Sequence, residues 1–211
     1  MTNRREILQM GVLASALPIA GSQFISAVNA TSQGATAYTT PYKVIFDERF
    51  AQSVAFGAEA RRRGARVHAI QGDITSLWYH ELDAQWKAQP VAIAGLTTHG
   101  PAFCLEILAR DHGMRVVYRA EHACVRNEVS HACTGPQSAL DRLRALGSAG
   151  DHWPLQVASL ITQFPAEHGS MASSTMVGVT HPQATADEEP LLSWVIAPKS
   201  GARRIIPSTA A

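Results

Sequence analysis

The stretch PVAIAGLTTHGPAFCLEILARDHGMRVVYRAEH, residues 90–122, contains a strand, a loop, a helix and a second strand in that order. Residues 91–96 form a short apolar run rich in β-formers, which predicts a strand buried on both faces. Turn residues 97–101 follow, and Pro101 suits the first position of a helix that ends at Gly113. Residues 115–118 predict the next strand. A parallel unit of this kind collects its strand-to-helix loops at one edge of the sheet.

The chain before this stretch shows the same alternation of strands and helices. Residues 42–46 and 66–70 predict strands, and a helix over residues 50–63 lies between them. A further helix starts near Asp73 or Thr75, either of which can cap it, and ends before Pro90. We therefore expect an α/β fold, a three-layer sandwich whose sheet is mostly parallel with flavodoxin-like or Rossmann-like strand order.

The pattern changes after this parallel part. Residues 119–135 alternate as in a β-hairpin that turns at Asn127, and short helices are predicted at 137–146 and 154–164. Residues 166–190, rich in Ser, Thr, His and Pro, predict a long loop. The run LLSWVIA, residues 191–197, predicts a final strand added at the edge of the sheet.

Length and composition indicate one globular domain. Of 211 residues, 46% are hydrophobic, which is enough to build a core, and we assign residues 42–198 to a single α/β domain. Residues 31–41 predict a flexible lead-in and residues 199–211 a tail. Lys plus Arg number 18 against 17 acidic residues, so no strong positive field is available and nucleic acid is not expected as a partner.

The first thirty residues predict a targeting segment. Arg4 and Arg5 precede an apolar run over residues 10–20, which is too short to form a permanent membrane span. Residues 28–30, Val-Asn-Ala, offer small side chains to a signal peptidase. We therefore expect residues 1–30 to be a cleaved signal peptide.

Residues 3–9, NRREILQ, resemble the leader of twin-arginine (Tat) exported proteins, whose pattern is Ser or Thr, Arg, Arg, any residue, Phe, Leu, Lys. Arg4, Arg5 and Leu8 match this pattern, whereas positions 3, 7 and 9 depart from it. The resemblance covers the leader alone. It implies a periplasmic protein that folds before export, carrying a cofactor or bound to a cofactor-bearing partner such as an oxidoreductase subunit. A Sec signal with an accidental arginine pair is the alternative.

Polar side chains follow each predicted parallel strand. In a parallel sheet these side chains converge on one crevice, where Arg49 can pair with an anion, two threonine hydroxyls can donate, and His99 can act as acid or base. A small polar ligand is the expected occupant. Asp73 and Thr75 could instead be caps, and His99 a solvated loop residue. The residues of this edge are Asp47, Glu48, Arg49, Asp73, Thr75, Thr97, Thr98 and His99.

The hairpin repeats a His-Ala-Cys triplet. A two-residue turn places His122 opposite His131, with Cys124 and Cys133 on the same face of the hairpin, and a soft metal ion accepts such ligands. This register separates the two cysteines, so all four side chains cannot bind one ion. A Cys124–Cys133 disulfide is the competing prediction in an oxidising compartment, and it requires a longer turn.

Cys104 lies in the first turn of the predicted 101–113 helix, where the helix dipole can activate a thiol, although a small buried hydrophobe is the common alternative. The chain lacks GxGxxG, Walker, GxSxG, CxxCH and HExxH motifs, so no cofactor is indicated. Our leading hypothesis is an exported ligand-binding or accessory protein associated with a periplasmic redox enzyme. The alternative is a stand-alone hydrolase, isomerase or lyase that uses His99 with Asp47 or Cys104, or a metal at His122 and His131.

Overall fold

The computed structural model describes residues 38–125, 127–166, 170–179 and 189–199, which belong to one compact unit, Thr36–Ala211. The predicted signal peptide at residues 1–30, most of the lead-in and nearly all of the tail lie outside the described residues. None of the helices in this part of the chain combines the length and the apolar character needed to cross a membrane.

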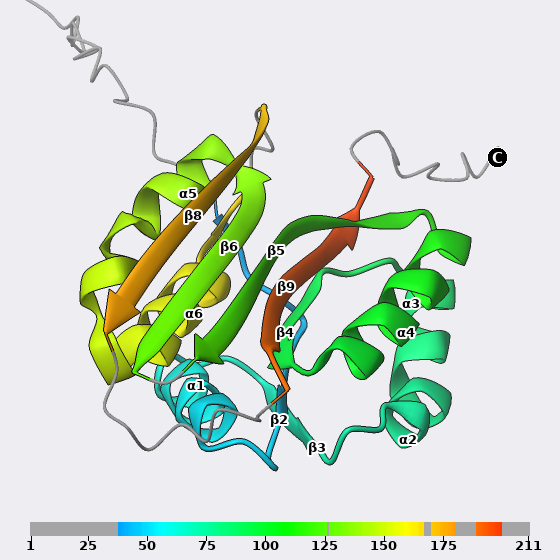
Figure 1. Ribbon diagram of the computed structural model, residues 1–211. Helices are drawn as coiled ribbons and strands as arrows, with labels where there is room; N and C mark the ends of the chain where they lie inside the picture. Colours follow the sequence, from blue (N-terminus) through cyan, green and yellow to red (C-terminus); the bar gives the residue numbers. More distant parts are fainter. Residues whose placement is uncertain (1–37, 126, 167–169, 180–188, 200–211) are drawn as a thin grey trace, which may run out of the picture. The chain divides into compact units, whose positions relative to one another are not determined.

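Seven strands form one mixed sheet in the order β3-β2-β4-β9-β5-β6-β8 (Figure 1). β2 pairs in parallel with β3 and β4, and the four remaining pairs are antiparallel. The α/β class is confirmed, but the prediction of a mostly parallel, flavodoxin-like sheet is wrong. The strands are β2 (Lys43–Asp47), β3 (Val67–Ile70), β4 (Ile93–Thr97), β5 (Met114–Val125), β6 (Glu128–Pro136), β8 (Met171–Val179) and β9 (Leu191–Pro198). A separate two-stranded sheet pairs β1 (Tyr38–Thr39) with β7 (Phe164–Pro165).

The last strand, β9, lies inside the sheet and not at its edge. It pairs with β4 on one side and with β5 on the other, so it separates the two strands of the 90–122 unit. Residues 191–197 are all buried, because both faces of β9 are covered and both edges are paired. The predicted edge position was wrong because an uninterrupted apolar run is typical of an interior strand.

Residues 171–179, predicted to be part of a long loop, form the edge strand β8, which pairs antiparallel with β6. Exposed and half-buried residues alternate along this strand, as expected where one sheet face is covered and the other meets solvent. Met171, Val177 and Val179 lie on the exposed face. The Ser and Thr content suggested a loop, whereas cross-strand pairing with β6 decides the structure.

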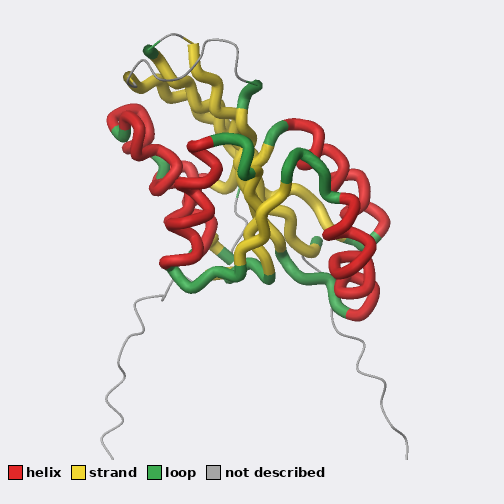
Figure 2. The backbone as a smooth tube through the Cα atoms, turned by 90° about the horizontal axis from the view of Figure 1, so that it is seen from below, coloured by secondary structure: helices red, strands yellow, loops and turns green. Residues whose placement is uncertain are grey.

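Helices cover both faces of the sheet (Figure 2), with a hydrophobic core on each face. Val44 and Val195 meet the helices of one face, and Ile45 and Trp194 meet those of the other. The first group comprises α1 (Ala51–Arg62), α5 (Gln137–Arg142), the 3₁₀ turns η2 (Arg144–Ser148) and η3 (Gly150–His152), and α6 (Trp153–Thr162). The second comprises α2 (Thr75–Leu77), the π-helical turn η1 (Trp78–Leu82), α3 (Asp83–Ala88) and α4 (His99–Asp111).

Glycines end two of the helices as predicted. Gly64 follows α1 with φ of 86°, and Gly113 follows α4 with φ of 68°, a backbone region that residues with a side chain rarely adopt. The start of α4 differs from the prediction, because the helix begins at His99 and Pro101 is its third residue. Proline is tolerated there because the first four N–H groups of a helix have no partner within it.

Candidate functional site

The carboxyl ends of β2 and β4 form a topological switch point. From β2 the chain passes through α1 to β3 on one side, whereas β4 lies on the other side of β2 and continues into α4. α1 and α4 pack on opposite faces of the sheet. A switch point leaves a crevice outside the strand ends, and ligands of open α/β sheets bind there. The loop edge predicted from the sequence is therefore present in the parallel part of the sheet.

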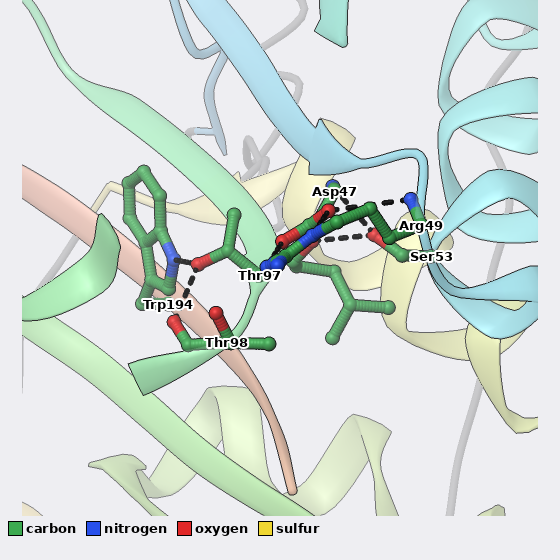
Figure 3. Close-up of polar contacts among 7 residues, drawn as sticks. Asp47, Arg49, Ser53, Thr97, Thr98 and Trp194 are labelled. Atoms are coloured by element: carbon green, nitrogen blue, oxygen red, sulfur yellow. Dashed lines mark hydrogen bonds and ion pairs between the residues drawn. The ribbon is translucent and has the colours of Figure 1, made fainter. Parts of the chain in front are cut away.

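A buried ion pair lies at the end of β2 (Figure 3). The Asp47 carboxylate is fully buried and accepts hydrogen bonds from Arg49, at 2.9 Å from Nε to Oδ1 and 2.7 Å from Nη2 to Oδ2. These bonds raise the pKa of Arg49 above its ordinary value, so the guanidinium stays charged. About half of the Arg49 side chain is exposed. Its inner edge is held by Asp47, and its outer N–H groups are available to a ligand.

Two further side chains connect the strand ends. The Ser53 hydroxyl accepts a hydrogen bond from the Asp47 backbone N–H at 2.8 Å and donates to the Leu96 carbonyl at 2.6 Å. Thr97 accepts a hydrogen bond from Trp194 Nε1 and donates to the Thr98 carbonyl, both at 3.1 Å (Figure 3). Sequence reasoning identified neither Ser53 nor Trp194. The Ser53 bonds link α1 to β2 and β4, and the Trp194 bond links β9 to β4.

Two long helices, α1 and α4, begin at this edge, and neither has a side-chain cap at its start. The N-cap residues, Phe50 of α1 and Thr98 of α4, make no side-chain capping hydrogen bond. A Cβ atom on Gly100 would meet nothing within 4 Å, so the second residue of α4 faces open space. Helix N-termini carry partial positive charge and offer N–H donors to an acceptor. The edge is therefore rich in hydrogen-bond donors.

The loop after β3 closes against Arg49 and brings acidic side chains nearby. Asp73 Oδ1 accepts hydrogen bonds from the backbone N–H and hydroxyl of Thr75, at 2.9 and 2.6 Å, and the bond from the hydroxyl lowers the Asp73 pKa. Glu48 accepts a hydrogen bond from Gln71 at 2.7 Å. The predicted ligand residues Asp73 and Thr75 thus bond to each other at the start of α2.

The predicted catalytic set is not joined by hydrogen bonds in the described part of the chain. His99 is exposed as the first residue of α4, and its ring stacks on Phe103 with centroids 5.8 Å apart. The Asp47 carboxylate bonds to Arg49 and not to His99. Cys104 is an exposed residue further along α4, which corrects the expectation that it packs in the core. His99 is accessible, and no described side chain holds its imidazole by a hydrogen bond.

The hairpin histidines form a second polar cluster, which is buried in the core. His122 lies opposite His131 as predicted, and their Nδ1 atoms are 2.7 Å apart, so one Nδ1 donates to the other. His122 Nε2 lies 2.8 Å from Ser193 Oγ, and the Trp153 ring stacks on His122 with centroids 4.3 Å apart. His131 Nε2 is buried with no hydrogen-bond partner among the described residues. Burial lowers the pKa of His131 to about 4.

The cysteines of the hairpin do not complete a metal site or a disulfide. Cys124 pairs with Val129 and Cys133 with Ala120, so the two cysteines are several strand rows apart, as the predicted register required. The structure contains no disulfide among Cys104, Cys124 and Cys133. No group of three or more His, Cys, Asp or Glu side chains in the described ranges is arranged to hold a metal ion. Burial raises the pKa of Cys133 to about 11, so this thiol is protonated.

No protein family model, curated protein or solved structure matches this chain.

Proposed function

We propose that this protein binds a small polar ligand through a single anionic group, such as a carboxylate, at the switch point between β2 and β4. The observation that carries the proposal is the half-exposed guanidinium of Arg49, anchored by buried Asp47 where two uncapped helices begin. Donors that are fixed before binding lose little entropy when the ligand arrives.

The surrounding charge favours one weak anion over a polyphosphate. Asp47 already neutralises Arg49, and Glu189 also interacts with the guanidinium electrostatically. Glu48 and Asp73 add negative charge in the flanking loops. A multiply charged ligand would be repelled here, whereas a carboxylate could use the outer N–H groups of Arg49 and the N–H groups that start α4.

We propose, on the basis of the leader, that the protein acts in the periplasm as a binding or accessory protein for an oxidoreductase. The support is the match of Arg4, Arg5 and Leu8 to the Tat pattern. Accessory proteins need a ligand or partner surface but no catalytic group, which agrees with an Asp47 that bonds to Arg49 and a His99 that no described side chain holds by a hydrogen bond.

Calorimetric titration with butanoate tests ligand binding, with butan-1-ol as the neutral analogue. We expect butanoate to bind and butan-1-ol not to bind. Arg49→Lys keeps the charge beside Asp47 but loses the bidentate fork, so it should weaken butanoate binding about tenfold, equivalent to about 1.4 kcal/mol. Arg62→Lys is the matched control, because Arg62 is an exposed partner of Glu59 at the end of α1. Equal affinities of wild type and Arg49→Lys would exclude Arg49 from the site.

The alternative function, a stand-alone enzyme, has one observation in favour of each of its two forms. The His99 imidazole is exposed at the same edge of the sheet, where it could act as acid or base on a bound ligand. A metal at His122 and His131 is the other form of this alternative, and its support is the buried His131 Nε2, which has no hydrogen-bond partner in the described part of the chain. Metal analysis of the purified protein tests it, since stoichiometric metal should disappear in His122→Ala and His131→Ala.

A further inference from the structure

An apolar groove lies beside the switch point, between the α2–η1 segment and α4. Its volume is about 360 Å³, within the roughly 300–1,000 Å³ of small-molecule sites. It is lined by Ile74, Thr75, Trp78, Tyr79, Phe103, Cys104, Ile107 and Leu108. Three of its apolar residues are unusually exposed for their type, Tyr79 by 73%, Phe103 by 49% and Ile107 by 40%. The groove thus presents hydrophobic surface to the solvent.

The walls of the groove follow from the local helix geometry. Phe103 and Ile107 are four residues apart on α4, so they lie on the same face of the helix and form one wall. The opposite wall is the π-helical turn η1, which begins at Trp78. Single π-helical turns are uncommon in helices and occur frequently at functional sites. The Trp78 ring packs edge-on against Trp86, with centroids 5.8 Å apart, which fixes this wall on the core.

Two side-chain contacts connect the lining of the groove with the switch point. α4 starts at the crevice with His99, whose ring stacks on the groove residue Phe103. On the opposite side, the groove residue Thr75 bonds to Asp73 in the loop that closes against Arg49. A molecule held at the start of α4 by its anionic end would therefore extend directly over Phe103 and Ile107.

We propose that the ligand is amphipathic, with its carboxylate at the switch point and an apolar body in the groove between α2–η1 and α4. This inference rests on the proposed function, because it takes the anionic end to bind at Arg49. Burial of the apolar body against Phe103, Ile107 and Trp78 supplies affinity that a small acid lacks. A medium-chain fatty acid, or another monocarboxylate with a hydrocarbon body, fits this chemistry.

The test is calorimetric titration of the full mature protein with straight-chain acids from butanoate to dodecanoate, below their micelle concentrations. Affinity should rise about twofold per methylene until the groove is filled, about half the effect of complete burial because the groove is open to solvent. Phe103→Gln and Ile107→Gln should flatten this dependence, because they should weaken the binding of decanoate more than that of butanoate, whose short chain covers less of the groove. Val54→Gln is the matched control, since Val54 is an exposed apolar residue of α1 outside the groove.

The outcomes separate this inference from the proposed function. Butanoate binding with an affinity that does not grow with chain length would overturn the groove inference and leave the proposed function intact. Failure of every acid to bind would overturn both. Equal binding of decanoate and decan-1-ol would show that the groove holds apolar chains without the switch point, which contradicts the amphipathic ligand proposed here.

Discussion

Gly72 packs directly against the guanidinium of Arg49. A Cβ atom added to Gly72 would lie 2.5 Å from Arg49 Cζ, which is closer than any side-chain atom can approach. Gly72 also has φ of 79°, a conformation that costs energy for a residue with a side chain. The loop after β3 therefore packs closely on the guanidinium that Asp47 holds.

Substitution Gly72→Ala should weaken ligand binding as well as stability. Gly64→Ala is a matched control, because Gly64 has φ of 86° but open space around its Cβ position. Both variants should lose about 1 kcal/mol of folding stability, because alanine is strained at a positive φ. Only Gly72→Ala should also displace Arg49 and reduce butanoate affinity, measured by calorimetry beside urea unfolding. Equal butanoate affinities in the two variants would mean that Gly72 does not position the guanidinium.

Ser53→Ala should destabilise the protein by about 2–3 kcal/mol, because it leaves two buried backbone groups without partners. The Ser53 hydroxyl accepts from the Asp47 N–H and donates to the Leu96 carbonyl, and all three residues are buried. Ser76→Ala changes an exposed serine at the start of the α2–η1 segment and should cost less than about 0.5 kcal/mol. Urea unfolding measures both, and a small effect of Ser53→Ala would mean that water replaces the hydroxyl.

Local sequence patterns were sufficient for the parallel part of the sheet and for its loop edge. β2 and β4 end side by side at one edge, as expected for neighbouring parallel strands, because strand and helix periods together with Gly64 and Gly113 determine these units locally. Ser53 was missed, although its spacing of three and seven residues from buried Phe56 and Ala60 places it on the inner face of α1. A small polar residue on such a face indicates a buried hydrogen bond.

The strand order could not be predicted from local patterns. β9 lies between β4 and β5, although it begins about seventy residues after the end of β5. Only pairing between segments far apart in the sequence decides that placement. The hydrogen bond from Trp194 to Thr97 depends on the same placement of β9, so it could not be predicted from local patterns either. β8 was mistaken for loop because its Ser and Thr residues lie on an edge strand with one face in solvent.

Export should depend on the paired arginines of the leader. Replacing Arg4 and Arg5 together with Lys should stop accumulation of the processed protein in the periplasm, because the Tat route reads the arginine pair and not charge alone. Arg61→Lys with Arg62→Lys is the control, since this pair lies at the end of α1. Fractionation followed by immunoblotting measures export. Unchanged periplasmic accumulation of the Arg4 and Arg5 variant would favour the Sec route.

The enzyme alternative makes a prediction at His99. We expect wild type and His99→Ala to hydrolyse p-nitrophenyl butanoate at the same background rate, because the exposed imidazole stacks on Phe103 and makes no hydrogen bond with a described side chain. Stability should change by less than about 0.5 kcal/mol, since His99 is on the surface. A rate in the wild type that disappears in His99→Ala, at unchanged stability, would replace the binding proposal with a catalytic one.

Acidification should destabilise the protein between about pH 6.5 and about pH 4, because two imidazoles are buried in the neutral form. Burial lowers the pKa of His131 to about 4, and burial together with the neighbouring His131 lowers the pKa of His122 well below its ordinary value. The unfolded chain takes up protons at the ordinary pKa near 6.5, so falling pH favours unfolding. The expected loss is about 1.4 kcal/mol per pH unit for each buried histidine.

Urea unfolding at about pH 7.5 and about pH 5 measures this loss in the wild type and in a His122→Phe, His131→Leu double variant. The variant should lose most of the pH dependence, because its apolar pair binds no proton in either state. His80→Gln, which removes an exposed histidine, should retain it. The hydrogen bond from Arg62 lowers the pKa of Glu59 to about 2, so the stability that Glu59 supplies is lost only as the pH falls below its unfolded pKa near 4.5. The pH dependence above about pH 5 therefore reports the histidines. An unchanged pH dependence in the double variant would mean that another group with a lowered pKa in the fold causes it. Partly buried His68, whose pKa burial also lowers, is the next residue to replace.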